Sequence, residues 1–130
     1  MLSGGYTRTI AGSYLAAGPT TAPPDSIDGS AAYFNNPVGM DITADGSSLL
    51  IADTDFGCIR RVGLKGSYPV TRWLGVCSSS NATYRDGAAS AASFRRPLSL
   101  SIARDNSNAF VIDGLDIRRV IINPDGERVY

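Results

Sequence analysis

The sequence has no histidine and a single lysine, and these shortages exclude several kinds of function. Histidine is the commonest catalytic base and metal ligand, so a histidine-dependent active site or metal centre is excluded within this chain. A cysteine nucleophile would also lack its usual histidine partner. The sequence therefore predicts that the chain is not an enzyme and that it binds no cofactor and no metal.

An excess of charge of either sign is missing as well. The 12 cationic side chains balance the 12 anionic ones, and no cationic run occurs. A balanced chain has no bulk attraction to nucleic acid or to an anionic membrane, so we do not expect nucleic acid as a partner. Arg95-Arg96, with Arg85 nearby, is the one candidate footprint for RNA, and solvated loop arginines are the alternative interpretation.

Long apolar runs and helical periods are absent too. The apolar runs are far shorter than the roughly 20 residues of a membrane-spanning helix, so we expect no membrane span. Residues 1–5 lack the apolar core of a secretory signal, so any such signal was removed or lies outside this chain. The remaining pattern is short apolar segments between turn residues, which is typical of strands.

What the sequence does have is an internal repeat. Phe94 and Pro97 follow Phe34 and Pro37 at the same spacing, with Asp-Gly pairs before each copy. Three blocks then recur in the same order: Val38-Gly-Met-Asp-Ile42 as Leu98-Ser-Leu-Ser-Ile102, Leu49-Leu-Ile-Ala-Asp53 as Ala109-Phe-Val-Ile-Asp113, and Ile59-Arg-Arg-Val62 as Ile117-Arg-Arg-Val120.

Each copy predicts four short antiparallel strands followed by a loop, which is the pattern of a β-propeller blade. The motifs of the first copy resemble the NHL repeat: Phe-x-x-Pro-x-Gly at residues 34–39, Ala-Asp-Thr-Asp at 52–55, Cys-Ile-Arg-Arg-Val at 58–62 and Thr-Arg-Trp-Leu-Gly at 71–75. The second copy departs from the family pattern at Ser99, which replaces a glycine, and at residues 113–116, which replace the usual loop. The resemblance implies an all-β fold of β-propeller blades that serve as protein-binding or RNA-binding platforms and occasionally as enzymes.

The predicted organisation is a single NHL-like β-propeller segment over residues 1–130. It has a leading strand at residues 1–12, a loop at 13–33, a first blade at 34–75, a loop at 76–93 and a second blade at 94–130 that lacks a full fourth strand. A propeller ring needs roughly 4–8 blades, so this open two-blade unit requires neighbouring copies or missing repeats. The chain could also be a fragment of a longer propeller.

The order of the predicted strands favours self-association. Residues 7–12 are similar to the fourth strand at residues 71–75, but they precede any matching first three strands. Thr7, Thr9 and Ile10 would be donated to the last strand of the next copy, where Ile117, Val120 and Ile122 would receive them. Such a head-to-tail contact closes a ring if the rotation allows it and otherwise grows into a fibre.

The two cysteines indicate the compartment. Cys58 begins the third predicted strand of the first unit and Cys77 follows the fourth, so a hairpin would bring them within disulfide distance. Two buried thiols in a cytosolic protein are the alternative. Asn81-Ala-Thr83 is a glycosylation sequon in the next loop. A disulfide beside a sequon favours an extracellular or cell-surface location.

Each unit has two aspartates in the loop between its second and third predicted strands. They are Asp53 and Asp55 in the first unit and Asp113 and Asp116 in the second. Carboxylates gathered on one rim could bind Ca²⁺, but we expect Asp53 and Asp113 to fix the turns by accepting backbone hydrogen bonds.

We therefore expect a non-enzymatic extracellular interaction or structural module that assembles through blade packing and strand donation. Its partners would be copies of itself or adjoining propeller repeats, with a protein ligand on the loop rim as a further option. An RNA- or protein-binding platform inside the cell and a fragment of a propeller enzyme are the alternatives.

Overall fold

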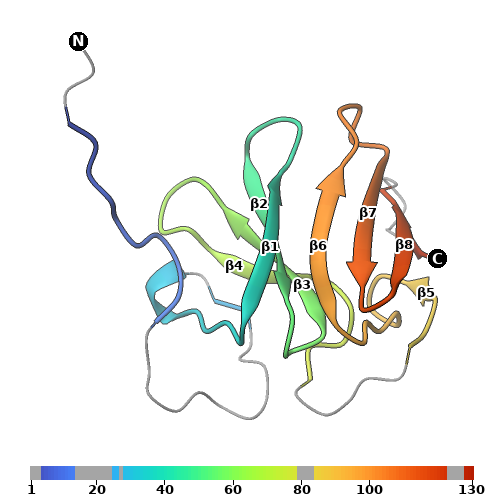
Figure 1. Ribbon diagram of the computed structural model, residues 1–130. Helices are drawn as coiled ribbons and strands as arrows, with labels where there is room; N and C mark the ends of the chain where they lie inside the picture. The colour runs from blue at the N-terminus through green and yellow to red at the C-terminus, as the bar shows by residue number, and fades with distance from the viewer. Residues whose placement is uncertain (1–3, 14–24, 27, 79–83, 123–127) are drawn as a thin grey trace.

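The computed structural model of the chain describes residues 4–13, 25–26, 28–78, 84–122 and 128–130. These residues form two antiparallel sheets that lie side by side, with one short 3-10 helix, η1 (Gly29–Ala31), beside the first sheet (Figure 1). The predicted all-β fold is confirmed. Within the described ranges no helix is long and apolar enough to cross a membrane.

The first sheet is a four-stranded meander in the order β1-β2-β3-β4. Tight turns set its strand ends: between the first two strands, the Asp45 carboxylate accepts hydrogen bonds from the Ser47 amide and the Thr43 hydroxyl. Aspartate commonly fixes a turn in this way. The strands are β1 (Pro37–Ile42), β2 (Ser48–Asp53), β3 (Cys58–Gly63) and β4 (Val70–Leu74).

The second sheet repeats this meander and adds a short strand at its outer edge, in the order β5-β9-β8-β7-β6. Its strands are β5 (Gly87–Ala88), β6 (Pro97–Ile102), β7 (Asn108–Asp113), β8 (Asp116–Ile121) and β9 (Arg128–Val129). The same register shift follows the proline that opens β1 and the proline that opens β6. The repeat seen in the sequence is therefore also a repeat in backbone geometry.

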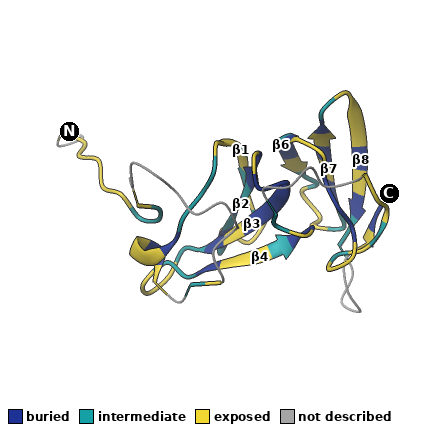
Figure 2. Cartoon of the chain, turned by 90° about the horizontal axis from the view of Figure 1, so that it is seen from below, coloured by how far each residue is buried: buried dark blue, intermediate teal, exposed yellow. Residues whose placement is uncertain are grey.

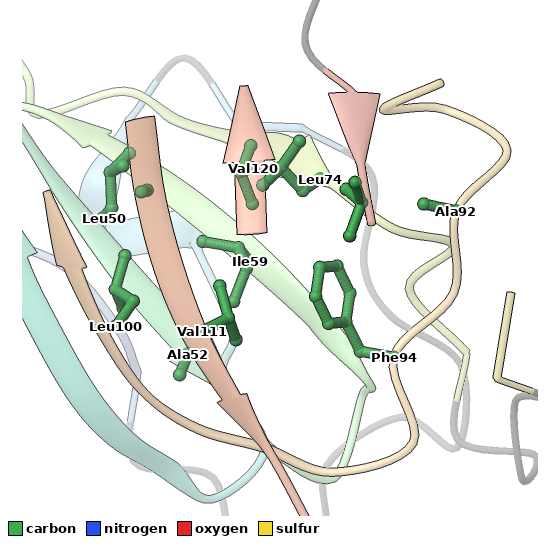
Figure 3. Close-up of a cluster of buried hydrophobic side chains, with 11 residues drawn as sticks. Leu50, Ala52, Ile59, Leu74, Ala92, Phe94, Leu100, Val111 and Val120 are labelled. Atoms are coloured by element: carbon green, nitrogen blue, oxygen red, sulfur yellow. The ribbon is translucent and has the colours of Figure 1, made fainter. Parts of the chain in front are cut away.

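The main core lies between the two sheets. Leu50, Ala52 and Ile59 of the first sheet face side chains of the second, and Phe94 from the connecting segment fills the space beside them (Figure 3). Burying an aliphatic or aromatic side chain of this size stabilises the fold by roughly 1.5–3 kcal/mol. The buried members of the core are Leu50, Ala52, Ile59, Leu74, Ala92, Phe94, Leu100, Ala109, Val111, Val120 and Val129.

Two polar ties and one close approach fix how the sheets meet. The Asp41 carboxylate of β1 accepts a hydrogen bond from the Ile102 amide of β6 at 2.8 Å, and the Thr54 hydroxyl donates to the Pro97 carbonyl at 2.7 Å. At Gly39, an added Cβ would lie 2.5 Å from the Leu98 carbonyl oxygen. The centre of the sheet contact therefore depends on the absence of a side chain there.

The predicted leading strand is not paired within the described part of this chain. Residues 4–12 have no strand assignment, and Figure 1 shows this segment running away from the sheets. A strand needs a partner for its backbone hydrogen bonds. Among the described residues, the segment's backbone bonds that hold it to the fold begin at its end, where the Gly12 amide donates to the Gly29 carbonyl at 2.9 Å.

Cys58 and Cys77 form the predicted disulfide, with their Cα atoms 5.0 Å apart. The bridge ties the first residue of β3 to the segment that leaves β4, and it closes a loop of 19 positions. It therefore fastens the outer edge of the first sheet only.

Reduction of this disulfide should lower the free energy of unfolding by about 3 kcal/mol, because the open chain gains conformational entropy in the unfolded state. Urea unfolding with and without dithiothreitol measures the difference. A Cys58→Ser/Cys77→Ser variant serves as control and should be insensitive to the reductant. Equal midpoints for the oxidised and reduced wild type would contradict this role.

Gly39→Ala should destabilise the protein by about 2 kcal/mol, because its new methyl group overlaps backbone atoms that cannot move aside cheaply. Ser99→Ala changes the matching position of the second sheet and should alter stability by less than about 0.5 kcal/mol. Urea unfolding of both variants tests this. Equal effects at the two positions would show that the close approach of β1 and β6 is not required.

Candidate interaction surface

Each sheet buries one arginine, and that of the second sheet is well paired. Arg118 donates to the Ser93 carbonyl and to the Asp86 carboxylate, both at 2.6 Å, and contacts the Asp113 carboxylate at 3.2 Å. Its guanidinium carbon also lies 4.9 Å from the centre of the Phe94 ring. Charged hydrogen bonds that Arg118 donates to two carboxylates compensate for burying this cation.

The matching arginine of the first sheet, Arg60, has fewer of its donors hydrogen-bonded. Arg60 lies 3.8 Å from the Asp53 carboxylate and 3.4 Å from the Tyr33 carbonyl. Its Nε and Nη2 atoms, and Oδ2 of Asp53, are buried without a hydrogen-bond partner among the described residues. Burial raises the pKa of Asp53 to about 6 and lowers the pKa of Arg60. The two charges therefore compensate each other only in part.

The aspartates that end β2 and β7 accept hydrogen bonds from backbone amides, as expected from the sequence. Oδ1 of Asp53 accepts from the Asn35 amide at 2.7 Å, and the Asp113 carboxylate accepts from the Arg96 amide at 2.6 Å. That interpretation is confirmed for these two residues. In the part of the chain that the structure describes, no group of three carboxylate or cysteine side chains is arranged to hold a metal ion.

The chain enters both sheets through the same local geometry. Gly12 and Gly75 have φ values of 97° and 87°. The Gly12 amide donates to the Gly29 carbonyl and the Gly75 amide to the Ala89 carbonyl, each at 2.9 Å. Gly75 directly follows β4, so residues 4–11 lead into the first sheet as β4 leads into the second.

Both glycines also pack on equivalent rings. An added Cβ on Gly12 would lie 3.4 Å from Cδ2 of Phe34, and one on Gly75 would lie 2.9 Å from Cδ2 of Phe94. Phe94 is fully buried between the sheets, whereas Phe34 is only partly covered. The first ring is therefore in the position of the second but lacks a neighbouring sheet above it.

One face of the first sheet is apolar and exposed. We call it the leading face: Val38, Met40, Ile42, Leu49 and Ile51, which the β1–β2 register places side by side. Met40 is 66% exposed, whereas Leu100 at the matching position of the second sheet is 5% exposed. The difference arises because the second sheet has a neighbour on this face and the first sheet has none.

The second sheet also has an exposed apolar face, on the side that is turned away from the first sheet. We call it the trailing face: Phe110, Ile112, Ile117 and Tyr130, which the strand pairings place on one side. Phe110 is 47% exposed and Ile117 76%, while the matching Leu50 and Ile59 of the first sheet are 2% and 0% exposed. Figure 2 shows much of β8 as exposed.

The three predicted receiving residues lie in different surroundings. Ile117 is exposed at the edge of β8, whereas Val120 is buried in the core between the sheets and pairs with Val129 of β9. Ile122 is partly buried against the same core, and its amide donates to the Ser107 carbonyl. Among the described residues, the unpaired edge of β8 is therefore limited to residues 116–118.

The remaining predicted residues are placed as follows. Thr7 and Thr9 are exposed and Ile10 is half-buried, all on the segment before Gly12. Asn81 lies outside the described residues. Arg85, Arg95 and Arg96 are exposed in the segment that precedes β6.

The buried arginines were missed by the sequence analysis. The alternation of Ile59-Arg60-Arg61-Val62 places Arg60 on the same face as Val62, and this was the available signal that the side chain lies inside.

Known proteins give no further guide to these surfaces. No protein-family model matches the sequence, and no curated protein matches it with significance. The surfaces are therefore interpreted from their own chemistry, which is an unpaired strand edge and two apolar faces.

Asp53 should give protein stability a pH dependence of unusual sign. Its pKa is about 6 in the folded chain against an ordinary value of 3.8, so the folded state holds this proton more tightly. The resulting stability is fully present below pH 3.8 and is lost as the pH rises through about 6. Relative to Asp53→Asn, the wild type should lose up to about 3 kcal/mol over this interval, measured by urea unfolding.

Asp45 acts in the opposite direction, because hydrogen bonds from Ser47 and Thr43 lower its pKa to about 2. Its effect cancels when the wild type and Asp53→Asn are compared at each pH. Asp116→Asn, at an exposed position of the second sheet, is the control and should keep the wild-type profile. Parallel profiles for the wild type and Asp53→Asn would refute the assignment.

Proposed function

We propose that the chain is a two-blade piece of an NHL-like β-propeller and acts as a non-enzymatic interaction module of an extracellular or cell-surface protein. It binds further sheets by packing blade against blade and by donating residues 7–10 as a fourth strand. Its partners are copies of itself or adjoining propeller repeats. The site is the segment before Gly12 together with the unpaired edge of β8.

The equivalence of Gly12 and Gly75 carries this proposal. The two glycines share backbone conformation, hydrogen bonding and an aromatic neighbour, and the strand before Gly75 is the fourth strand of its sheet. The residues before Gly12 have a similar sequence, Thr7-Arg8 against Thr71-Arg72. They therefore suit the place of a fourth strand for a sheet that precedes the first one.

The edge of β8 has an unpaired position where the first sheet has its fourth strand. In the first sheet, Ile59 of β3 pairs with Leu74 of β4. By the repeat, Ile59 corresponds to Ile117. Aligned on the Thr-Arg pairs, Leu74 corresponds to Ile10, and Ala11 is then one extra residue before Gly12. In the second sheet β9 pairs with β8 at Val120 and Ile121, and Tyr130 pairs with Arg119, which leaves the position of Ile117 open among the described residues. An open strand edge is a template for pairing with another chain.

The other parts of the proposal have their own support. Two four-stranded meanders that pack face to face with a repeated bulge after proline suit neighbouring blades of a propeller. The disulfide is compatible with an oxidising compartment. The absence of histidine from the sequence supports a role without catalysis.

A labelled peptide of residues 4–13 should bind the full chain at concentrations where the chain is monomeric by light scattering. Fluorescence anisotropy gives the dissociation constant. Ile117→Asp in the protein should weaken binding at least about tenfold, because it places a charge against the apolar side chain of Ile10. Val76→Asp, at an exposed position away from this edge, is the matched control and should bind normally.

A peptide carrying Ile10→Asp should lose affinity in the same way. Equal binding of the two peptides, or equal binding to the wild type and Ile117→Asp, would contradict strand donation at β8. The experiment does not require the chain to associate with itself, so it tests the proposal for any adjoining sheet.

A further inference from the structure

The leading and trailing faces are the two halves of one interface that the chain already contains. Inside the chain, Leu50, Ala52 and Ile59 of the first sheet pack against Leu100 and Val111 of the second. On the trailing face, Phe110, Ile112 and Ile117 match Leu50, Ala52 and Ile59 of the first sheet. On the leading face, Met40 and Ile51 match Leu100 and Val111 of the second sheet. Each exposed face is therefore the counterpart of the other.

Both faces expose large apolar side chains to water. Seven large hydrophobic side chains on them are exposed, and monomeric proteins rarely show contiguous apolar patches of this kind unless the patches bind something. These side chains are Val38, Met40, Ile42, Phe110, Ile112, Ile117 and Tyr130.

Contact between the faces of two copies cannot copy the internal interface atom for atom. Gly39 allows β6 to approach, since a Cβ there would lie 2.6 Å from the Cα of Ser99 and still closer to the Leu98 carbonyl. The second sheet has Ser99 where the first has Gly39, and Ser101 where the first has Asp41, which binds the Ile102 amide. A second copy must therefore keep its β1 farther from β6.

Larger side chains occupy the space that this separation creates. Phe110 stands where the first sheet has Leu50, and Ile112 stands where it has Ala52. Across from them, the flexible side chain of Met40 takes the place of Leu100, and methionine adapts well to irregular gaps. The substitutions at the strand centre and those on the face thus compensate each other, which favours a partner that carries the leading face itself.

We infer that a second copy of this chain binds through a wider sheet contact, with its leading face on the trailing face of the first copy. This inference rests on the proposed function and names the partner. The two faces differ, so the contact is head-to-tail and is not a two-fold dimer. Copies add in one direction until the ring closes, or continue as a filament.

Two lysine variants test the contact. Met40→Lys charges the leading face, and Ile112→Lys charges the trailing face; both side chains are exposed, so the fold should be retained. Each variant alone should remain monomeric, with an association constant at least about tenfold lower than that of the wild type. Mixed in equal amounts, they should form a one-to-one heterodimer, since one unmodified face of each variant can still meet.

Light scattering after size-exclusion chromatography measures the masses, and Ser90→Lys, in an exposed turn, should assemble as the wild type does. The inference is overturned if the mixture stays monomeric, if either variant alone assembles normally, or if the wild type remains a monomer at high concentration. In the last case the peptide experiment still decides whether an adjoining sheet is bound, so the failure of the inference is distinct from failure of the proposed function.

Discussion

The structure depends on apolar packing between sheets, which requires a neighbour on each face of a sheet. Both faces of the first sheet are apolar, and so are both faces of the second. Within the described chain each sheet has one neighbouring sheet, which buries one of its faces. The opposite face of the first sheet is buried over β3 and β4, at Val62 and Val70, but stays exposed over β1. Phe94 shows the result of a completed contact, since it is fully buried between the sheets. Phe34 shows the same position with a neighbour on one side only.

The two repeats have diverged in ways that suit different contacts. The first sheet carries the residues that allow and fix a close approach, namely Gly39, Asp41 and Thr54. At the first two of these positions the second sheet has serines, and its β7–β8 turn is shorter and contains Gly114. Phe110 and Ile112 are larger than the matching Leu50 and Ala52 and lie on the same face. The divergence is consistent with one internal contact and one external contact of different width.

The sequence predicted the parts of the fold that repeat. The four-strand pattern, the spacing of Phe34 and Phe94 and the Cys58–Cys77 hairpin are local or periodic signals, and the structure confirms the strands and the disulfide. The pairing of β5 with β9 could not be predicted, because it joins two-residue segments far apart in the chain. Val120 was assigned to an open edge because the sequence does not show that β9 returns to cover it.

The exposed apolar side chains, the partly covered Phe34 ring and the incompletely paired Arg60 of the first sheet all lie on the same face. The β1–β2 and β2–β3 registers place Met40, Ile51 and Arg60 on the same face, and Arg60 lies 5.7 Å from the ring of Phe34. Exposed apolar side chains, a partly covered ring and a buried arginine with unpaired donors thus occur together. In the second sheet the matching face is covered, and Arg118 is paired with two carboxylates, with only its Nε lacking a hydrogen-bond partner among the described residues. The arginine below the covered face therefore has more of its donors paired, and a buried cation is tolerated best where packing holds its partners in place.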